Sequence, residues 1–107
     1  MEWRVCFAVT FVTPEKEELE SMSLNTTLPF IPTPDIEYEF LFNSAPGSGK
    51  PEHILWDVEG KVFRVDLSDK VTTKKDLPLW HGVYHNAGFL TAEEYVAQRI
   101  AEENAER

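Results

Sequence analysis

The chain has 107 residues and a formal net charge of −9, from 19 acidic and 10 basic side chains. One domain spanning residues 1–107 is expected from that length, and 42% apolar with 12% aromatic residues is typical of a folded protein rather than a disordered chain. An acidic surface repels phosphates and anionic lipids, so this balance argues against direct nucleic-acid or membrane binding and favours a basic protein partner.

The negative charge lies at the two ends of the chain. Residues 1–39 hold eight acids and two bases (−6), residues 40–90 hold six of each, and residues 91–107 hold five acids and two bases (−3). The two terminal segments are therefore the parts expected to meet a cationic partner.

Cys6 is the only cysteine, which excludes an intrachain disulfide. It lies in an apolar run, where a buried small side chain is a simpler interpretation than a reactive thiol. The first twelve residues have neither the pattern of a secretion signal nor that of a membrane span, so a cytoplasmic protein is predicted.

Alternating apolar residues predict a strand over residues 3–11. Its second face is also small or apolar, which places it inside the sheet with cover on both faces. For residues 14–23 two interpretations stay open. One is a short helix with Thr13 as its N-cap, and the other is an acidic loop.

Prolines recur through residues 24–34 and predict an extended connector. Leu28, Phe30 and Ile31 lie between them. These three side chains either cap the end of the core or form a recognition segment for a partner.

A second strand is predicted over residues 36–42, with one apolar and one partly acidic face, followed by a flexible loop over residues 44–51. That loop contains Gly47-Ser48-Gly49-Lys50, but it is not a phosphate-binding loop. Ser44 replaces the first glycine of that motif, and Pro51 stands where a metal-binding hydroxyl is required.

A β-hairpin is predicted over residues 53–67, with Glu59-Gly60 as its turn. Counting outward from the turn places Trp56 opposite Phe63 and Ile54 opposite Val65. These apolar pairs predict one face of the hairpin to be in the core.

Residues 68–75 are predicted to be a solvated loop, and residues 77–89 a short strand or an irregular packed segment. A helix follows, because Thr91 as N-cap and Glu94 three residues later form a capping box. Its apolar stripe consists of Ala92, Tyr95, Val96 and Ile100.

His81 and His85 are four residues apart and share a face in either a helix or a strand, which makes them weak candidates for a metal site or a catalytic centre. Two histidines fall short of the three or four ligands that a zinc site needs, so ordinary hydrogen-bonded histidines are the favoured interpretation. We therefore expect no metal, no cofactor and no catalytic residue.

Together these segments predict an α+β fold, with an antiparallel sheet of four to five strands and the C-terminal helix packed on one face. The first functional hypothesis is a non-enzymatic interaction protein, similar in role to small immunity or phage-borne inhibitor proteins, whose acidic face mimics nucleic acid and binds a basic nucleic-acid-handling protein. The second is an accessory or assembly subunit that uses the proline-rich segment or a sheet edge, with a homodimer possible, and the third is a small His-dependent metal protein or enzyme. The partner-binding candidates are Glu15, Glu17, Glu18, Glu20, Asp35, Glu37, Glu39, Phe30 and Ile31.

Overall fold

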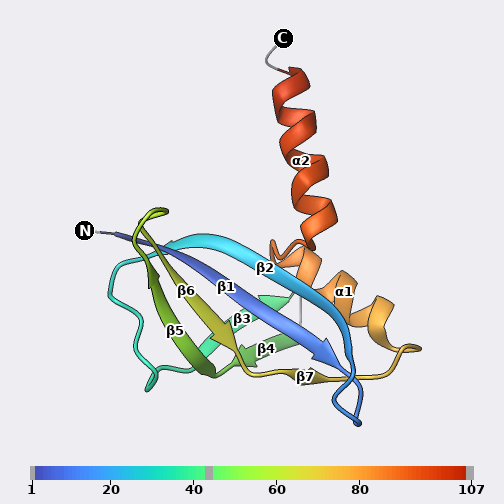
Figure 1. Ribbon diagram of the computed structural model, residues 1–107. Coiled ribbons are helices and arrows are strands. Elements are labelled where there is room, and N and C mark those ends of the chain that lie inside the picture. Colours follow the sequence, from blue (N-terminus) through green and yellow to red (C-terminus); the bar gives the residue numbers. More distant parts are fainter. Residues whose placement is uncertain (1, 43–44, 106–107) are drawn as a thin grey trace.

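A computed structural model describes residues 2–42 and 45–105 (Figure 1). It is an α+β fold with a larger and a smaller sheet and two helices. In chain order the elements are β1 (Trp3–Val12), β2 (Glu18–Leu28), β3 (Tyr38–Phe42), β4 (Ala45–Gly49), β5 (Pro51–Asp57), β6 (Val62–Leu67), β7 (Lys70–Val71), α1 (Leu77–Asn86) and α2 (Ala92–Ala105).

The larger sheet is mixed, so the prediction of an antiparallel sheet is wrong in this respect. Its strand order is β2-β1-β6-β5, and β7 pairs with the end of β1. The chain passes through a connector and the β3–β4 pair after β2, and β6 then enters the sheet parallel to β1. Parallel neighbours require such a crossover, and the local sequence pattern of β1 and β6 does not reveal it.

The core lies on one face of β1, where Val5, Phe7, Val9 and Phe11 are each at most 3% exposed. The interior position predicted for this strand is confirmed. Cover on both faces is not, because Arg4 is exposed on the opposite face and Cys6, Ala8 and Thr10 are only partly buried there. The buried residues that complete the core are Met22, Tyr38, Val65, Leu67, Tyr84 and Phe89.

The helix considered for residues 14–23 is absent from the structure, and the acidic loop is limited to a tight turn between β1 and β2. Thr13 closes this turn, since its hydroxyl oxygen accepts a hydrogen bond from the Glu17 N–H (3.0 Å) and its own N–H donates to the Glu17 carbonyl (2.8 Å). Lys16 adopts φ 72° within the turn. The side chain predicted to cap a helix therefore initiates the antiparallel strand β2 instead.

The predicted strand over residues 36–42 is present as β3, but it pairs only with β4 in a separate two-stranded sheet. β4 replaces the flexible loop predicted for residues 44–51, of which residue 44 lies outside the described residues. Tyr38 packs edge-on against Phe7, with ring centroids 4.8 Å apart. This contact holds the small sheet against the core face of the large one.

The hairpin register is confirmed, since Trp56 pairs with Phe63 and Ile54 with Val65 in β5 and β6. The turn is supported by Asp57, whose Oδ1 accepts hydrogen bonds from the N–H groups of residues 59 and 60 (3.1 and 3.0 Å). Val65 is fully buried, whereas Trp56 remains 46% exposed. Only the inner part of the predicted apolar face therefore lies in the core.

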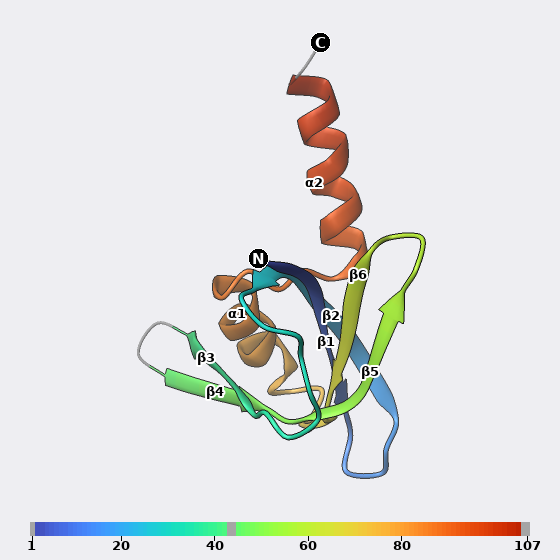
Figure 2. The same cartoon turned by 90° about the vertical axis from the view of Figure 1, so that its left-hand side faces the viewer.

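Helix α1 occupies the segment for which a strand or irregular structure was predicted, and it covers the core face of the sheet. Its buried Tyr84 packs edge-on against Phe11 and Phe89, with centroids 5.2 Å away in each case. Helix α2 instead projects away from the sheets (Figures 1 and 2), and none of its described residues is buried. The predicted packing of the C-terminal helix on the sheet is thus not confirmed. Among the described residues, no helix is both long and apolar enough to span a membrane.

Candidate functional site: a projecting helix and its histidine latch

The segment between the two helices places the start of α2 at the edge of the large sheet. Gly88 adopts φ 105° just after α1, a conformation that side-chain-bearing residues rarely adopt, and an added Cβ would lie 3.1 Å from Leu24. Leu90 then pairs with Ser23 of β2 through two backbone hydrogen bonds of 2.8 and 2.9 Å. Helix α2 therefore begins beside the edge strand rather than over the sheet.

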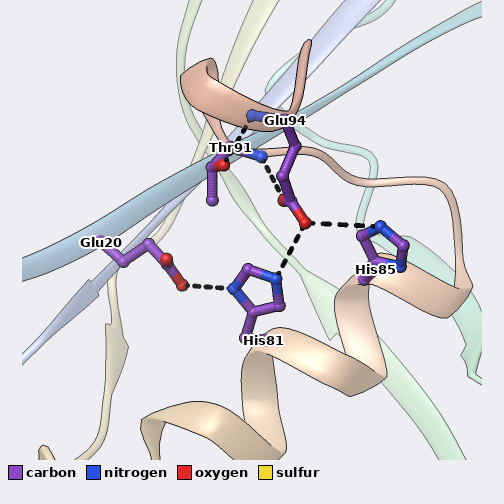
Figure 3. Close-up of polar contacts among 5 residues, drawn as sticks. All are labelled: Glu20, His81, His85, Thr91 and Glu94. Carbon is purple, nitrogen blue, oxygen red and sulfur yellow. Dashed lines mark hydrogen bonds and ion pairs between the residues drawn. The ribbon is translucent and has the colours of Figure 1, made fainter. Parts of the chain in front are cut away.

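The first turn of α2 is closed by the predicted capping box. The Thr91 N–H donates to Glu94 Oε1 (2.9 Å), and the Glu94 N–H donates to the Thr91 hydroxyl oxygen (3.2 Å). These bonds satisfy two N–H groups that have no partner within the helix. They also fix the Glu94 carboxylate so that its other oxygen faces α1 (Figure 3).

His81 joins three elements through that carboxylate. Its Nδ1 lies 3.0 Å from Glu20 Oε2 on β2, and its Nε2 lies 3.1 Å from Glu94 Oε2 on α2 (Figure 3). His85, one turn further along α1, stacks on His81 with centroids 6.0 Å apart and places its Nε2 3.4 Å from the same Glu94 oxygen. We call Glu20, His81, His85 and Glu94 the histidine latch.

The charges of the latch reinforce one another. The hydrogen bond that His81 donates to Glu20 raises the pKa of His81, burial opposes this effect, and the bond that His81 donates to Glu94 raises the pKa further. The hydrogen bond from the Thr91 N–H lowers the pKa of Glu94, and His81 lowers it further. A protonated His81 that donates to both carboxylates is the state these shifts favour.

This geometry favours a structural role for His81 over a catalytic or metal-binding one. Both ring nitrogens contact carboxylate oxygens, so neither is left to bind a metal ion or to transfer a proton to a substrate. Across the described ranges, no group of three or more His, Cys, Asp or Glu side chains is arranged to hold a metal ion. The latch fastens the base of α2 to α1 and β2.

Beyond the latch, α2 exposes the apolar stripe predicted from sequence. Val96 and Ile100 are 54% and 53% exposed, and Tyr95 is 40% exposed. Together with Ala92 and Ala97, the first two line a shallow apolar hollow beside Glu93. The exposed charged residues of the helix are Glu93, Arg99, Glu102 and Glu103.

The acidic residues proposed as a partner surface fall into separate groups. Glu15, Glu17 and Glu18 are exposed around the turn that follows β1, whereas the Glu20 carboxylate is engaged by His81. Asp35 and Glu37 are exposed in the connector, which starts from the opposite end of the sheet. Glu39 lies in β3, and its side chain is outside the described part of the structure. The β1–β2 turn and the start of the connector thus lie at opposite ends of the β1–β2 pair.

The apolar candidates of the connector are accessible. Phe30 is 41% exposed and Ile31 50% exposed, so these two side chains do not complete the core. Leu28 is partly buried and packs against the core. The core-capping interpretation therefore applies to Leu28, and Phe30 and Ile31 stay candidates for contact with a partner.

Sequence reasoning identified two members of the latch as a histidine pair and Glu94 as a capping residue, but it did not connect them. Glu20 is 61 positions from His81. No local pattern signals that contact, because it depends on how β2, α1 and α2 are placed.

Comparisons of the chain with models of protein families, with curated protein sequences and with solved structures find no match.

Proposed function

We propose that this chain is a non-enzymatic interaction protein that binds a basic protein through helix α2. One observation carries the proposal. Along its described length of 14 residues, α2 buries no side chain, yet it exposes a stripe of large apolar residues. Isolated helices of this length are marginal in water, and amphipathic helices commonly bind by laying such a stripe into a groove.

The charges beside the stripe indicate the chemistry of the partner. Glu93, Glu102 and Glu103 outnumber Arg99 on the exposed surface of α2, and the whole chain carries −9. A groove with an apolar floor and a rim of Lys or Arg complements this surface. The exposed acids of the β1–β2 turn add long-range attraction, which speeds encounter more than it tightens the complex.

Occupation of a basic groove by an acidic helix excludes nucleic acid from that groove. The proposal therefore retains an inhibitor or immunity-type role against a nucleic-acid-handling protein, supported by the charge of the chain and by the accessibility of α2.

The test is affinity purification from the native host with three forms of the protein. The double variant Val96→Asp/Ile100→Asp disrupts the stripe. The charge-matched control Val71→Asp/Leu79→Asp alters two residues of β7 and α1 that are 56% and 67% exposed. We expect a basic partner with the wild type and the control, and at least a tenfold loss of affinity for the α2 variant when the purified partner is titrated.

Salt provides a second arm of the same experiment. Binding is expected to weaken as ionic strength rises, since exposed charges are screened within about 10 Å at 0.1 M salt. Equal binding by the two double variants, or binding that does not respond to salt, contradicts the proposal.

The accessory-subunit alternative is favoured by the exposure of Phe30 and Ile31 in the connector. It predicts an association that is insensitive to salt, is lost in the variant Phe30→Ser/Ile31→Ser and is unaffected by the α2 substitutions.

A further inference from the structure

The two edges of the large sheet differ in their protection. The edge at β2 is polar, with exposed Asn25, Thr26 and Thr27, and part of it is capped where Leu90 pairs with Ser23. The edge at β5 has no partner strand within the described residues. An open edge presents unpaired N–H and C=O groups that can pair with another strand.

The side chains of β5 provide little protection against such pairing. Leu55 is 55% exposed and Trp56 46% exposed, and Val58 beyond the strand is 74% exposed. Edge strands are usually protected by Lys, Pro, bulges or inward-pointing charges. In β5 the register shift lies between Pro51 and His53, so the run from residue 53 to residue 56 lacks these features.

We propose that the outer edge of β5 pairs antiparallel with β5 of a second copy of this chain, about a twofold axis at Leu55. In this register Leu55 lies opposite its own counterpart, and Ile54 lies opposite Trp56 of the partner subunit. His53 lies opposite Asp57 of the partner subunit, and this pair occurs twice because of the twofold symmetry. Apolar pairs and pairs of opposite or hydrogen-bonding groups are the cross-strand contacts that stabilise a sheet.

The chemistry of the opposed side chains favours this register over its neighbours. Opposed residues of an antiparallel ladder point to the same face, so the twofold axis passes at a residue, and the neighbouring registers place it at Ile54 or at Trp56. The axis at Ile54 places Glu52 opposite Trp56 of the partner subunit, and the axis at Trp56 places Leu55 opposite Asp57 of the partner subunit. Both alternatives oppose an acidic and an apolar side chain, whereas the axis at Leu55 pairs apolar with apolar residues and His53 with Asp57 of the partner subunit.

The position of β5 also reduces the repulsion between two chains of charge −9. The strand belongs to residues 40–90, where six acids are balanced by six bases, whereas the excess charge lies in the terminal segments. Pairing at β5 produces one continuous sheet through both copies, an isologous arrangement typical of homodimers. This dimerisation through β5 does not depend on the function proposed for α2.

Disulfide trapping tests the register directly. In a Cys6→Ser background, Leu55→Cys places two thiols on the twofold axis, where directly opposed Cα atoms are about 4.5–5.5 Å apart and within disulfide reach. The control Glu52→Cys is six residues out of register, which separates its Cα atoms by about 20 Å along the strands. We expect a covalent dimer from Leu55→Cys on oxidation and none from Glu52→Cys.

Light scattering supplies a test that does not depend on the cysteine variants. The wild type is expected to have the mass of a dimer, and Leu55→Lys that of a monomer with unchanged circular dichroism. The matched control Leu79→Lys, at an exposed site on α1, stays dimeric. A monomeric wild type overturns the proposal, as does equal cross-linking at residues 52 and 55. If β5 instead pairs with a strand of another protein, the wild type is monomeric in isolation.

Discussion

The two helices differ in a way that their sequences do not suggest. Helix α2 has a capping box and an apolar stripe, yet it buries no side chain. Helix α1 has Asp76 as its N-cap, but the Asp76 side chain makes no capping hydrogen bond, and the first two helical residues are Leu77 and Pro78. This helix nevertheless buries Tyr84 in the core. The capping box and apolar periodicity thus predict α2 but not α1, and the position of each helix relative to the sheet determines which of them packs.

The difference arises from where each helix leaves the sheet. β7 pairs with the end of β1, and the chain then passes directly into α1, which places this helix beside the buried Phe11. Helix α2 starts from the bridge between Leu90 and Ser23, at the outer edge of β2. Within the part of the chain that the structure describes, no strand lies beyond that edge for α2 to cover.

The largest expected effect on stability distinguishes the buried helix α1 from the exposed helix α2. Tyr84→Ala removes a buried aromatic ring of α1 and is expected to lower the free energy of unfolding by about 3–4 kcal/mol. Ile100→Ala on α2 changes it by no more than about 0.5 kcal/mol. Urea unfolding of both variants measures the contrast, and similar losses show that α2 packs on the body in solution.

The second effect concerns the latch, the contact that ties the two helices together. His81→Gln removes the charged hydrogen bonds to Glu20 and Glu94, and we expect a loss of about 1–2 kcal/mol near pH 6. His85→Gln is the matched control, with a smaller loss, because its distance to Glu94 is 3.4 Å. Equal losses in the two variants contradict the central position of His81.

The latch also predicts a pH dependence. The pKa of His81 is raised on folding, so its contribution is complete below the ordinary histidine value of about 6.5 and is lost as pH rises through the raised value. The pKa of Glu94 is lowered, so its contribution is complete above about 4.3 and is lost as pH falls through the lowered value. The stability difference between wild type and His81→Gln is therefore expected to be largest at about pH 4.5–6.5. Unfolding curves from pH 4 to pH 9 measure it, and a flat difference contradicts the prediction.

A smaller effect is expected at the capping box of α2. Thr91→Ala removes the cap and costs about 1 kcal/mol, concentrated in the first turn of the helix. Thr91→Ser keeps the hydroxyl and serves as the control. Hydrogen exchange is expected to increase for the first amides of α2 and to stay unchanged in α1. Faster exchange throughout α1 indicates that the helices unfold together.

The smallest effect on stability is expected from Val96→Asp/Ile100→Asp, the variant designed to abolish partner binding. Both residues are about half exposed, so the change in unfolding free energy is expected to be within about 0.5 kcal/mol for each. Thermal unfolding measures it. A large loss shows that the stripe packs intramolecularly and weakens its assignment to a partner.

Local sequence patterns predicted several elements well. β1 and the β5–β6 register follow from apolar alternation and turn length, and the capping box follows from two residues three positions apart. The same reasoning missed β2, where the Thr13 hydroxyl closes a turn instead of capping a helix. Thr13 can satisfy a backbone N–H in either structure, so its identity does not distinguish them.

The candidate site was predicted in part. The stripe on α2 and the i, i+4 spacing of His81 and His85 are visible in the sequence because both depend on neighbouring residues. The contact of His81 with Glu20 spans 61 positions and depends on the placement of β2 beside α1.

The sequence by itself determined the acidity of the chain, the strand character of β1, the hairpin and the presence of α2, since each depends on residues within a few positions of one another. Only the tertiary structure decided that the sheet is mixed, that α1 covers the core, that α2 projects from an edge, and that Glu20 meets His81. The physical reason is that these features arise from pairings between distant segments, and the sheet built by those pairings sets which surfaces remain for the helices to cover.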